Sequence, residues 1–407
     1  MTDRYTVVSA DGHAGADLLD YRPYLAARWH DEFERWAAAY VNPFADLLAP
    51  TAYRNWDSDR RLAEHEADGI VGEVLFPNTV PPFFAQSNLT ALAPAEHEYD
   101  ERWAGLQAHN RWLADFCAQA PGRRAGIVQI FLNRVEDAIA EIRWAKANLS
   151  VFGGALLPSV APNSQVRPLW DPYYEPLWEV CEELDVPLSI HSGSGLPDYG
   201  ELEAARAIML IELAWFAHRP LWHLIFGGIL EHHPGLRLAL TEQGTAWVPR
   251  GLDTLDWFYR RMTTTDSAEA NFFGAVVRQL SMLPSDYFRK HFRVGASFLR
   301  PSEAPLIADI GVDRIMWGDD YPHSEGSYPH STEALRVAFA GRSPDEVQAM
   351  VGDNAARFYG FDLAELKPIG DRIGPLVTEV ARPLVRDDYP VGSTCNAFER
   401  ESALKAW

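Results

Sequence analysis

The feature that most constrains the fold is an alternation of short apolar runs with helical stretches along most of the 407 residues. Eight runs have the length of a strand: "YTVVSADGH", "IVGEVLFPN", "RAGIVQIF", "GGALLPS", "VPLSIHSGSG", "LRLALTEQG", "FRVGASF" and "RIMWGDDYPH". Between most of them lie stretches such as "VEDAIAEIRWAKAN", in which apolar residues recur every three or four positions, as in an amphipathic helix. This alternation is typical of parallel β/α units. Eight units predict an α/β protein with a closed (β/α)8 TIM barrel, and an open doubly wound sheet is the alternative.

Composition narrows the class of partner. The formal net charge of −21 argues against nucleic acid or an anionic membrane as a partner. Three cysteines, Cys117, Cys181 and Cys395, are scattered without metal or redox spacing, which favours a reducing cytoplasm. The start of the chain does not resemble a signal peptide, and no apolar run reaches the roughly 18 residues of a membrane span. We therefore expect a cytoplasmic protein without a membrane partner.

Three segments fall outside the β/α repeat. Residues 14–60, rich in Trp, Tyr and Pro, predict a helical insertion after the first strand. Residues 78–100 form a Pro- and Phe-containing loop, a candidate lid over a pocket. We predict a barrel over residues 1–365 and a Pro-rich C-terminal extension over 366–407 that wraps either the barrel or a neighbouring subunit. A homo-oligomer is the expected assembly.

Polar residues at the ends of the strands are the candidates for a site, because chemistry in a parallel barrel lies at the carboxyl ends of its strands. Together, the aspartate, glutamate and histidine candidates named below offer a mixed set of oxygen and nitrogen donors, which suits Zn²⁺, Fe²⁺ or Mn²⁺. Each residue alone is more often a hydrogen-bonding or capping group, so the prediction depends on their combination. The candidates are Asp11 and His13 after the first run, His191 after the fifth, Glu242 or Gln243 after the sixth, and Asp319, Asp320 and His323 after the eighth.

Other residues give weaker signals. His65 lies in "RLAEHEADGI" and is predicted to sit on a solvated helix face, whereas His218 and His223 lie in an apolar segment and are predicted to be core or supporting residues. The aromatic residues Phe83, Phe84, Trp247 and Trp257 would suit a pocket for a hydrocarbon or acyl substrate, and ordinary core positions are the alternative.

Several motifs together resemble the amidohydrolase superfamily: "SADGH", "LSIHSG", "HHPGLRLALTEQGTAWVPRGLDTLDW", "RIMWGDDYPHSEGSYPHS" and "VGDNAARFYGFD". They look most like its amidohydrolase-related group, which includes aminocarboxymuconate-semialdehyde decarboxylase. The resemblance covers roughly residues 5 to 365 and implies a (β/α)8 barrel with a metal at the strand ends. By this resemblance, the metal ligands fall on Asp11, His13, His191 and Asp320.

Two departures from the family pattern bear on the chemistry. The sixth strand, where the decarboxylases and many hydrolases of the superfamily keep a histidine, reads "TEQG", so Glu242 or Gln243 takes that place. The fourth strand, where dinuclear hydrolases carry a carboxylated lysine, reads "GGALLPS". A lysine-bridged dizinc hydrolase is therefore not expected.

The carboxylate on strand six favours a dinuclear site, because carboxylates bridge ions and stabilise oxidised iron or manganese. A few superfamily members that look similar are nonheme diiron or manganese–iron monooxygenases. We predict such a monooxygenase, with two ions (Fe favoured, Mn or Zn as alternatives), hydroxylating a small apolar or acyl-type substrate with O₂. An external electron donor would be needed, since the sequence has no flavin or NAD motif. The metal ligands would be Asp11, His13, His191, Glu242, Asp320 and His323, with Glu242, Asp320 and His323 also catalytic.

The main alternative keeps the commoner chemistry of the family. One Zn²⁺ or Mn²⁺ on Asp11, His13, His191 and Asp320 would promote hydrolysis or nonoxidative decarboxylation of a small carboxylate or cyclic substrate, with Glu242 as general acid and base. A non-enzymatic barrel that binds a ligand or a related subunit is the third hypothesis. Candidate ligands on at least four strands argue against it.

Overall fold

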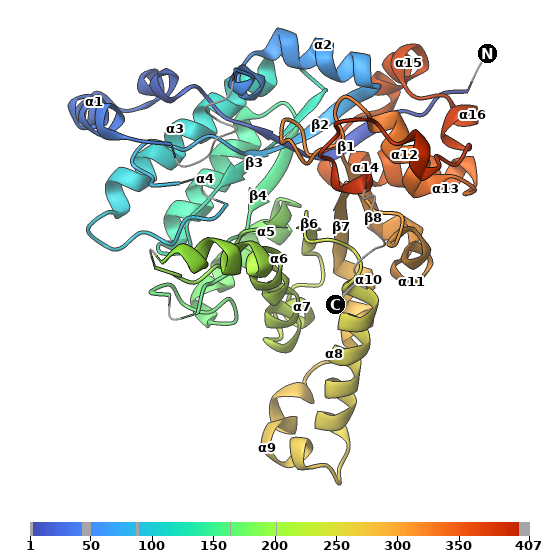
Figure 1. Cartoon of the computed structure of the whole chain (residues 1–407). Helices are drawn as coiled ribbons and strands as arrows, with labels where there is room; N and C mark the ends of the chain where they lie inside the picture. Colours follow the sequence, from blue (N-terminus) through green and yellow to red (C-terminus); the bar gives the residue numbers. More distant parts are fainter. Residues whose placement is uncertain (1–2, 43–49, 87–88, 163, 201, 399–407) are drawn as a thin grey trace.

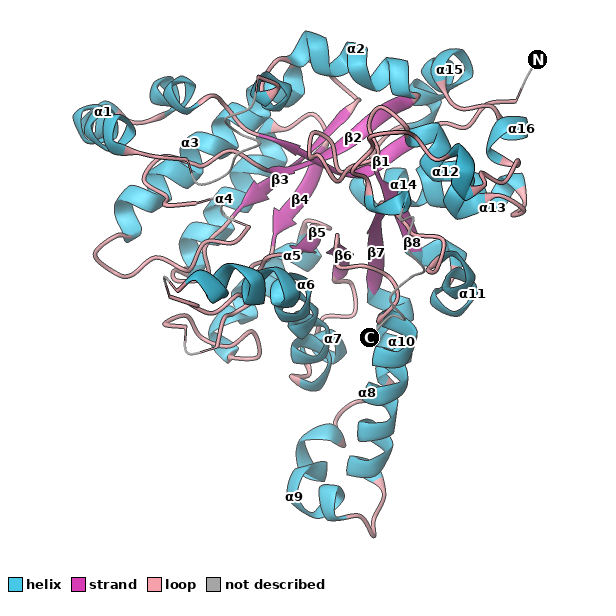
Figure 2. Cartoon of the chain, in the orientation of Figure 1, coloured by secondary structure: helices cyan, strands magenta, loops and turns pink. Residues whose placement is uncertain are grey.

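The structure, a computed structural model, describes residues 3–42, 50–86, 89–162, 164–200 and 202–398 (Figure 1). Its centre is one sheet of eight strands in the order β1 to β8, with helices around it (Figure 2). Every neighbouring pair from β1–β2 to β7–β8 is parallel, which confirms the predicted TIM barrel. The strands are β1 (Val7–Ala14), β2 (Ile70–Pro77), β3 (Arg124–Gln129), β4 (Phe152–Leu156), β5 (Pro187–His191), β6 (Arg237–Thr241), β7 (Phe292–Ser297) and β8 (Ile315–Gly318).

The barrel closes between β8 and β1, where the chain leaves β8. Gly12 pairs with Tyr321 in a parallel bridge. The backbone N–H of Asp320 donates to the carbonyl of Asp11 over 2.9 Å, and that of His13 donates to the carbonyl of Tyr321 over 2.7 Å. Two segments that carry candidate site residues therefore form the seam of the barrel.

The outer helices follow the strands in β/α order. The helix predicted over residues 135–148 coincides with α4, and its apolar stripe of Val135, Ala138 and Ile142 is buried, as amphipathic spacing requires. The helices are α1 (His30–Ala39), α2 (Ser58–Asp68), α3 (Tyr99–Ala118), α4 (Val135–Asn148), α5 (Glu175–Glu183), α6 (Glu203–Phe226), α7 (Ile229–His232), α8 (Val248–Thr263), α9 (Ala268–Val277), α10 (Pro284–His291), α11 (Ile307–Ile310), α12 (Ser331–Phe339), α13 (Pro344–Gln348), α14 (Asn354–Tyr359), α15 (Leu363–Ile373) and α16 (Val377–Val380).

Helix α2 leads directly into β2 and has clear end signals. The Asp57 carboxylate accepts a hydrogen bond from the N–H of Arg60 at 3.1 Å, which satisfies a free donor of the first turn. The helix ends at Gly69, whose φ of 86° lies in the left-handed region that glycine adopts without a side-chain clash. These ends fix which face of α2 meets the barrel.

The additions lie largely where the sequence suggested. In the described part of residues 14–60, the chain forms α1 and short 3-10 segments at Leu18–Tyr24, Ala27–Trp29 and Ala52–Asn55. The C-terminal segment runs back along its own chain, since the N–H of Tyr5 donates to the carbonyl of Pro375 at 3.0 Å. The division at residue 365 stays a prediction.

Helices α8 and α9 project from the barrel as an arm (Figure 1). Among the described residues, no helix has the combination of length and apolar character that crossing a membrane requires. The predicted cytoplasmic location stays a prediction.

Candidate metal and acid–base site

The six predicted site residues come together at the carboxyl ends of the strands. Four of them, from β1, β5 and the residue after β6, form one group: Asp11, His13, His191 and Glu242. A second group, which shares His13, adds Asp320 and His323 from the segment after β8. Within each group, one donor atom of every residue lies within 4.8 Å of the others. The barrel thus gathers side chains that are more than 300 residues apart in the sequence.

The histidine nitrogens face the carboxylates at short range. His13 Nε2 lies 3.3 Å from Asp11 Oδ1 and 3.1 Å from Asp320 Oδ1. His191 Nε2 lies 3.3 Å from Asp11 Oδ1 and 3.2 Å from Glu242 Oε2. Asp11, His13 and Asp320 have fully buried side chains, whereas the Glu242 side chain keeps 15% of its surface exposed. Glu242 is therefore the acidic member of the cluster that solvent can reach.

Contacts outside the cluster orient these side chains. His13 Nδ1 lies 3.4 Å from the carbonyl of Pro77, and His191 Nδ1 lies 3.0 Å from the carbonyl of Ser192. A carbonyl only accepts, so each Nδ1 carries a proton, and loss of the Nε2 proton would turn a lone pair toward the cluster. The Ser297 hydroxyl donates to Asp11 Oδ2. This is the arrangement in which metal-binding histidines and carboxylates are held.

The donor set fits a divalent metal ion. His13 Nε2 and Asp320 Oδ2 are buried, and neither makes a well-aligned hydrogen bond to any residue that the structure describes. Buried polar atoms are rarely left in that state unless water or an ion satisfies them. Two imidazoles with two or three carboxylates form a mixed nitrogen and oxygen set that suits Mn²⁺, Zn²⁺ or Fe²⁺. The residues present are therefore suitable metal ligands.

Crowded charges shift the pKa values within the cluster. Burial raises the pKa of Glu242 well above its usual range, and the neighbouring charges of Asp320 and Asp11 raise it further. Burial would raise the pKa of Asp11, but the close approach of the His13 and His191 rings to its carboxylate holds it below its usual range. Burial would lower the pKa of His323, but the Asp320 carboxylate raises it to about 10. Protons thus accumulate around the carboxylates, and a bound cation would displace some of them.

The backbone is strained at two of the candidate residues. Glu242 has a φ of 57° and Asp320 a φ of 56°, in the left-handed region that residues with a Cβ seldom adopt. Glu242 directly follows β6, and Asp320 is the second residue after β8, so each lies in the turn where the chain leaves its strand. Strain of this kind occurs most often at functional sites.

Side-chain direction resolves the alternative that the sequence left open and agrees with the choice of Asp320 over Asp319. Glu242, rather than Gln243, faces the cluster, because Gln243 donates from Nε2 to the carbonyl of Ile190 at 2.8 Å. Asp320, rather than Asp319, belongs to the cluster. Asp319 Oδ1 instead accepts from the Ser9 hydroxyl at 2.5 Å.

His323 is positioned by residues that the sequence analysis missed. Its Nδ1 lies 2.9 Å from Asp320 Oδ1, and its Nε2 lies 3.0 Å from Asn78 Oδ1. The Asn78 amide is oriented in turn, since its Nδ2 donates to Asn55 Oδ1 at 2.7 Å. Both ring nitrogens of His323 therefore face acceptors. Asn78 follows β2 and Ser297 ends β7, so the strand-end rule that selected the other residues could have found both.

A buried arginine beneath the cluster was also missed. Arg61 of α2 donates from Nη1 to the carbonyl of His13 at 2.7 Å, and its Nη2 lies 3.4 Å from the carbonyl of Tyr321. Glu73 of β2 holds the guanidinium at 2.6 Å. Nothing in the local pattern of the helix distinguishes Arg61 from Arg60, so only the tertiary structure reveals this contact.

Two weaker expectations are wrong. His65 is not on a solvated face: it is buried, with Nε2 3.4 Å from Asp319 Oδ2, because α2 packs that side against the barrel. The four aromatic residues do not form one substrate pocket. Phe83 packs on Trp29, Phe84 stacks on Phe131, Trp247 stacks on His218, and Trp257 is exposed on α8.

Comparison with known proteins places this chain in a family. Residues 24–361 match the amidohydrolase family model, Amidohydro_2. The chain belongs to this amidohydrolase family. The γ-resorcylate decarboxylase of Rhodococcus jostii (strain RHA1) is 29% identical over 248 residues, which cover 58% of this chain and 72% of the relative. The 2-amino-3-carboxymuconate-6-semialdehyde decarboxylase of Dictyostelium discoideum is 24% identical over 315 residues, which cover 75% of this chain and 77% of the relative.

A solved structure shares the fold. The dihydroxybenzoic acid decarboxylase from Polaromonas sp. JS666, with bound manganese and the inhibitor 2-nitroresorcinol, matches with a TM-score of 0.60 at 20% identity, covering 89% of this chain and 99% of that one. The expected resemblance to the group that includes aminocarboxymuconate-semialdehyde decarboxylase is thus confirmed, and the chain is an enzyme of this family.

The prediction of an O₂-dependent monooxygenase is wrong. The relatives named here are decarboxylases, and none of their names describes an oxygenase. The prediction relied on the carboxylate at the strand-six position, and a carboxylate there has another use, as a proton donor beside the metal ligands. Three further parts of that prediction are therefore withdrawn: the oxidoreductase class, the external electron donor and the preference for iron as an O₂-activating metal.

Proposed function

We propose that this chain is a metal-dependent, nonoxidative decarboxylase of a small aromatic carboxylate. The observation that supports it best is the buried cluster itself, in which Asp11, His13, His191 and Asp320 present metal-ligand atoms beside an acid, Glu242, that solvent can reach. The relatives named as decarboxylases supply the reaction class.

Asp11, His13, His191 and Asp320 would hold one divalent ion. The two groups of donors share His13 Nε2, and a neutral imidazole nitrogen offers a single lone pair, so one ion rather than the two predicted from the sequence is the simpler arrangement. Mn²⁺ is the first ion to test, since the decarboxylase from Polaromonas was solved with manganese.

The reaction needs a proton and no electrons from outside. The ring carbon that bears the carboxylate gains a proton, using an electron pair of the ring. The bond from that carbon to the carboxylate then breaks, its electron pair restores the aromatic ring, and CO₂ leaves. A divalent ion bound in the site supplies positive charge for the carboxylate and a neighbouring oxygen of the substrate. No oxidant, reductant or flavin takes part.

Three residues of this chain have roles in these steps. Glu242 delivers the proton from its carboxyl group to the ring carbon, and its partial exposure lets solvent reload it. His323, with acceptors at both ring nitrogens, places positive charge beside Asp320. The Phe76 ring lies 4.8 Å from the His191 ring and supplies an apolar wall that limits water at the site.

The function is tested by turnover of a panel of hydroxybenzoates. Protein is stripped of metal and reloaded with Mn²⁺, Zn²⁺ or Fe²⁺, and CO₂ release and the decarboxylated product are measured with and without O₂. We expect equal rates in the two atmospheres, about one ion per chain by elemental analysis, and no activity after chelation. O₂-dependent product, or hydrolysis without CO₂, would reject the proposal.

Glu242→Gln separates an acid from a metal ligand. We expect kcat to fall by about 10²- to 10⁴-fold, the usual contribution of a positioned acid, while Mn²⁺ content and KM change little. The amide keeps the shape of the side chain but has no acidic proton. A variant that loses its Mn²⁺ in proportion to its activity would instead make Glu242 a ligand.

A further inference from the structure

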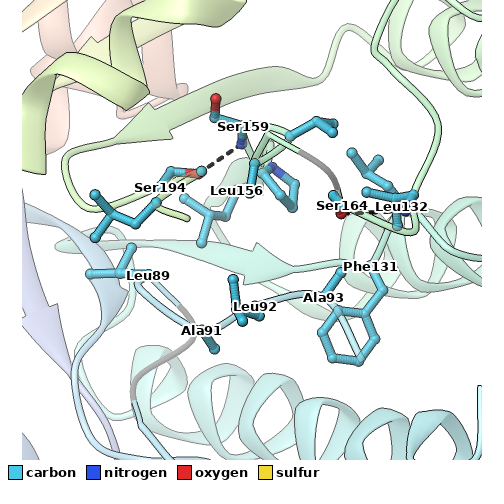
Figure 3. Close-up of a pocket in the computed structure, with 16 residues that line it drawn as sticks. Leu89, Ala91, Leu92, Ala93, Phe131, Leu132, Leu156, Ser159, Ser164 and Ser194 are labelled. Carbon is cyan, nitrogen blue, oxygen red and sulfur yellow. Dashed lines mark hydrogen bonds between the residues drawn. The ribbon is translucent and has the colours of Figure 1, made fainter. Parts of the chain in front are cut away.

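A small cavity lies beside the proposed site, at the same end of the barrel. The loop after β2 supplies one wall through Leu89, Ala91 and Leu92, and the ends of β4 and β5 supply the opposite wall through Leu156 and Ser194 (Figure 3). The cavity is thus enclosed between the segment predicted to be a lid and two strands of the barrel.

The lining has the chemistry of an apolar subsite. None of its residues, all of them in the described part of the chain, carries a charge. Its serine hydroxyls already have partners: Ser159 Oγ donates to the carbonyl of Phe216 at 3.0 Å, and Ser194 Oγ accepts from the N–H of Ser159 at 2.7 Å. A carboxylate placed here would find no charged side chain in the lining, so the cavity suits an uncharged group.

One wall of the cavity is joined to the proposed site through the turn after β5. The turn that carries Ser194 follows His191 directly, and the N–H of Ser194 donates to the carbonyl of His191 at 3.2 Å. Phe76, which packs on the His191 ring, belongs to the same buried cluster as Leu156, and Leu89 packs against that cluster. Buried apolar side chains therefore pack in a continuous cluster from the His191 ring to the wall of the cavity.

The size of the cavity limits what it can hold. Its volume of about 50 Å³ is several times the roughly 10–15 Å³ that one water requires on the same measure. A short alkyl chain of a few carbon atoms fits that space, whereas a second ring does not.

We propose that this cavity is a specificity subsite for a short, uncharged alkyl substituent on the aromatic acid. The inference rests on the proposed function, because the carboxylate of that acid would bind at the Asp11, His13, His191 and Asp320 cluster. The substrate is then an alkyl-substituted hydroxybenzoate rather than an unsubstituted one.

The test is a series of 2-hydroxybenzoates that carry unbranched alkyl chains from none to eight carbons. We expect kcat/KM to rise about three- to fourfold per added methylene, the value of burying it, up to a chain of a few carbons, and then to fall. Ala91→Phe fills the cavity and should abolish the rise while preserving activity on the unsubstituted acid. Leu19→Asp, a change at an exposed position outside the lining, is the control and should leave the series unchanged.

A binding measurement that needs no turnover distinguishes a failure of this subsite from a failure of the proposed function. Neutral alkylphenols of the same chain lengths are added to the Mn²⁺-loaded protein, and the thermal midpoint is measured. We expect stabilisation that depends on chain length in the wild type and not in Ala91→Phe. A flat response to chain length, or one that Ala91→Phe leaves intact, overturns the subsite even if decarboxylation occurs. If the thermal midpoint depends on chain length but no decarboxylation occurs, the proposed function is rejected and the apolar site is retained.

Discussion

Asp319 and Asp320 are adjacent in the sequence but point to different parts of the molecule. Asp320 reaches His13 and His323, whereas Asp319 contacts Ser9 and His65 on the other side of the strand end. The positive φ of Asp320 produces this divergence, because it turns the chain between the two side chains. The pair offers two buried carboxylates with different expected roles.

Asp320→Asn should remove a metal ligand. We expect loss of bound Mn²⁺ and a fall in kcat/KM of at least about 100-fold, more than the 10- to 100-fold typical of a residue that only supports a ligand. Asp319→Asn is the matched control, equally buried and one residue away, and should keep its Mn²⁺. Metal content by elemental analysis and steady-state kinetics measure both. Equal Mn²⁺ loss in the two variants would contradict this assignment.

At the scale of elements, α2 connects the seam between β1 and β8, where the barrel closes, to the neighbouring strand β2. Arg61 contacts a carbonyl of β1 and a carbonyl of the segment after β8, and Glu73 from β2 fixes its guanidinium. Arg124 shares Glu73 at 3.1 Å but donates elsewhere, to the Ser58 hydroxyl and the carbonyl of Phe116. The two buried arginines therefore differ mainly in whether they contact the metal-ligand backbone.

Arg61→Lys should weaken metal binding more than Arg124→Lys. A lysine keeps the charge but cannot reach both carbonyls and Glu73 at once, so we expect an approximately 10-fold rise in the Kd for Mn²⁺. Arg124→Lys should destabilise the fold to a similar degree with Kd unchanged. Titration of Mn²⁺ and thermal unfolding of the metal-free proteins separate the effects. Equal changes in Kd would show that Arg61 acts only on stability.

Asp68, the last residue of α2, predicts a pH dependence of stability. Burial raises the pKa of Asp68 to about 8, although hydrogen bonds from Ser331 oppose this rise. The native state therefore binds more protons than the unfolded state between about pH 4 and 8, so this group's contribution to stability falls as pH rises through that window.

Asp68→Asn should remove this dependence, because the amide keeps the contacts with Ser331 and carries no charge. We expect the variant to gain stability relative to wild type as pH rises from 5 to 8.5, by a few degrees in the thermal midpoint. Unfolding is followed by circular dichroism at both pH values. A constant difference between the two proteins across this range would contradict the raised pKa.

At the scale of the molecule, the proposed metal ligands join distant parts of the barrel. Residues from β1, β5 and the segment after β8 meet at one point, and the β1–β8 contact is also where the barrel closes. An ion that binds only this folded arrangement stabilises the whole domain.

Removal of the metal should therefore lower the thermal midpoint. With free Mn²⁺ at about 100 times its Kd, we expect about 2.7 kcal/mol of stabilisation, which a chelator abolishes. Calorimetry with and without chelator measures the shift, and Asp320→Asn should show none. A shift of the same size in that variant would mean that Mn²⁺ stabilises the protein from another site.

The projecting arm formed by α8 and α9 carries exposed apolar side chains that bear on the predicted homo-oligomer. Phe272 and Phe273 of α9 and Trp257 of α8 are 81%, 59% and 52% exposed. Large exposed apolar side chains at one place often mark a contact surface. The homo-oligomer expected from the sequence stays a prediction.

The sequence by itself determined the barrel and most of the residues of the candidate site. Runs that are apolar on both faces, alternating with amphipathic helices, can be buried only as parallel strands beneath helices, and the polar residues after Val8–Ala10, Ile190 and Met316–Gly318 then share one end. That local pattern selected Asp11, His191 and the pair Asp319 and Asp320, and the resemblance to the amidohydrolase superfamily then favoured Asp320.

Only the tertiary structure decided which of two neighbouring side chains joins the cluster, and which residues support it. A backbone turn decides that Glu242 rather than Gln243 faces the cluster. The packing of α2 against β2 decides that Arg61 rather than Arg60 supports it. The reaction class also lay outside the sequence pattern, because a carboxylate beside a metal site serves as a bridging ligand or as a proton donor. The related decarboxylases corrected the reaction class, and the Glu242→Gln variant distinguishes the two roles of the carboxylate.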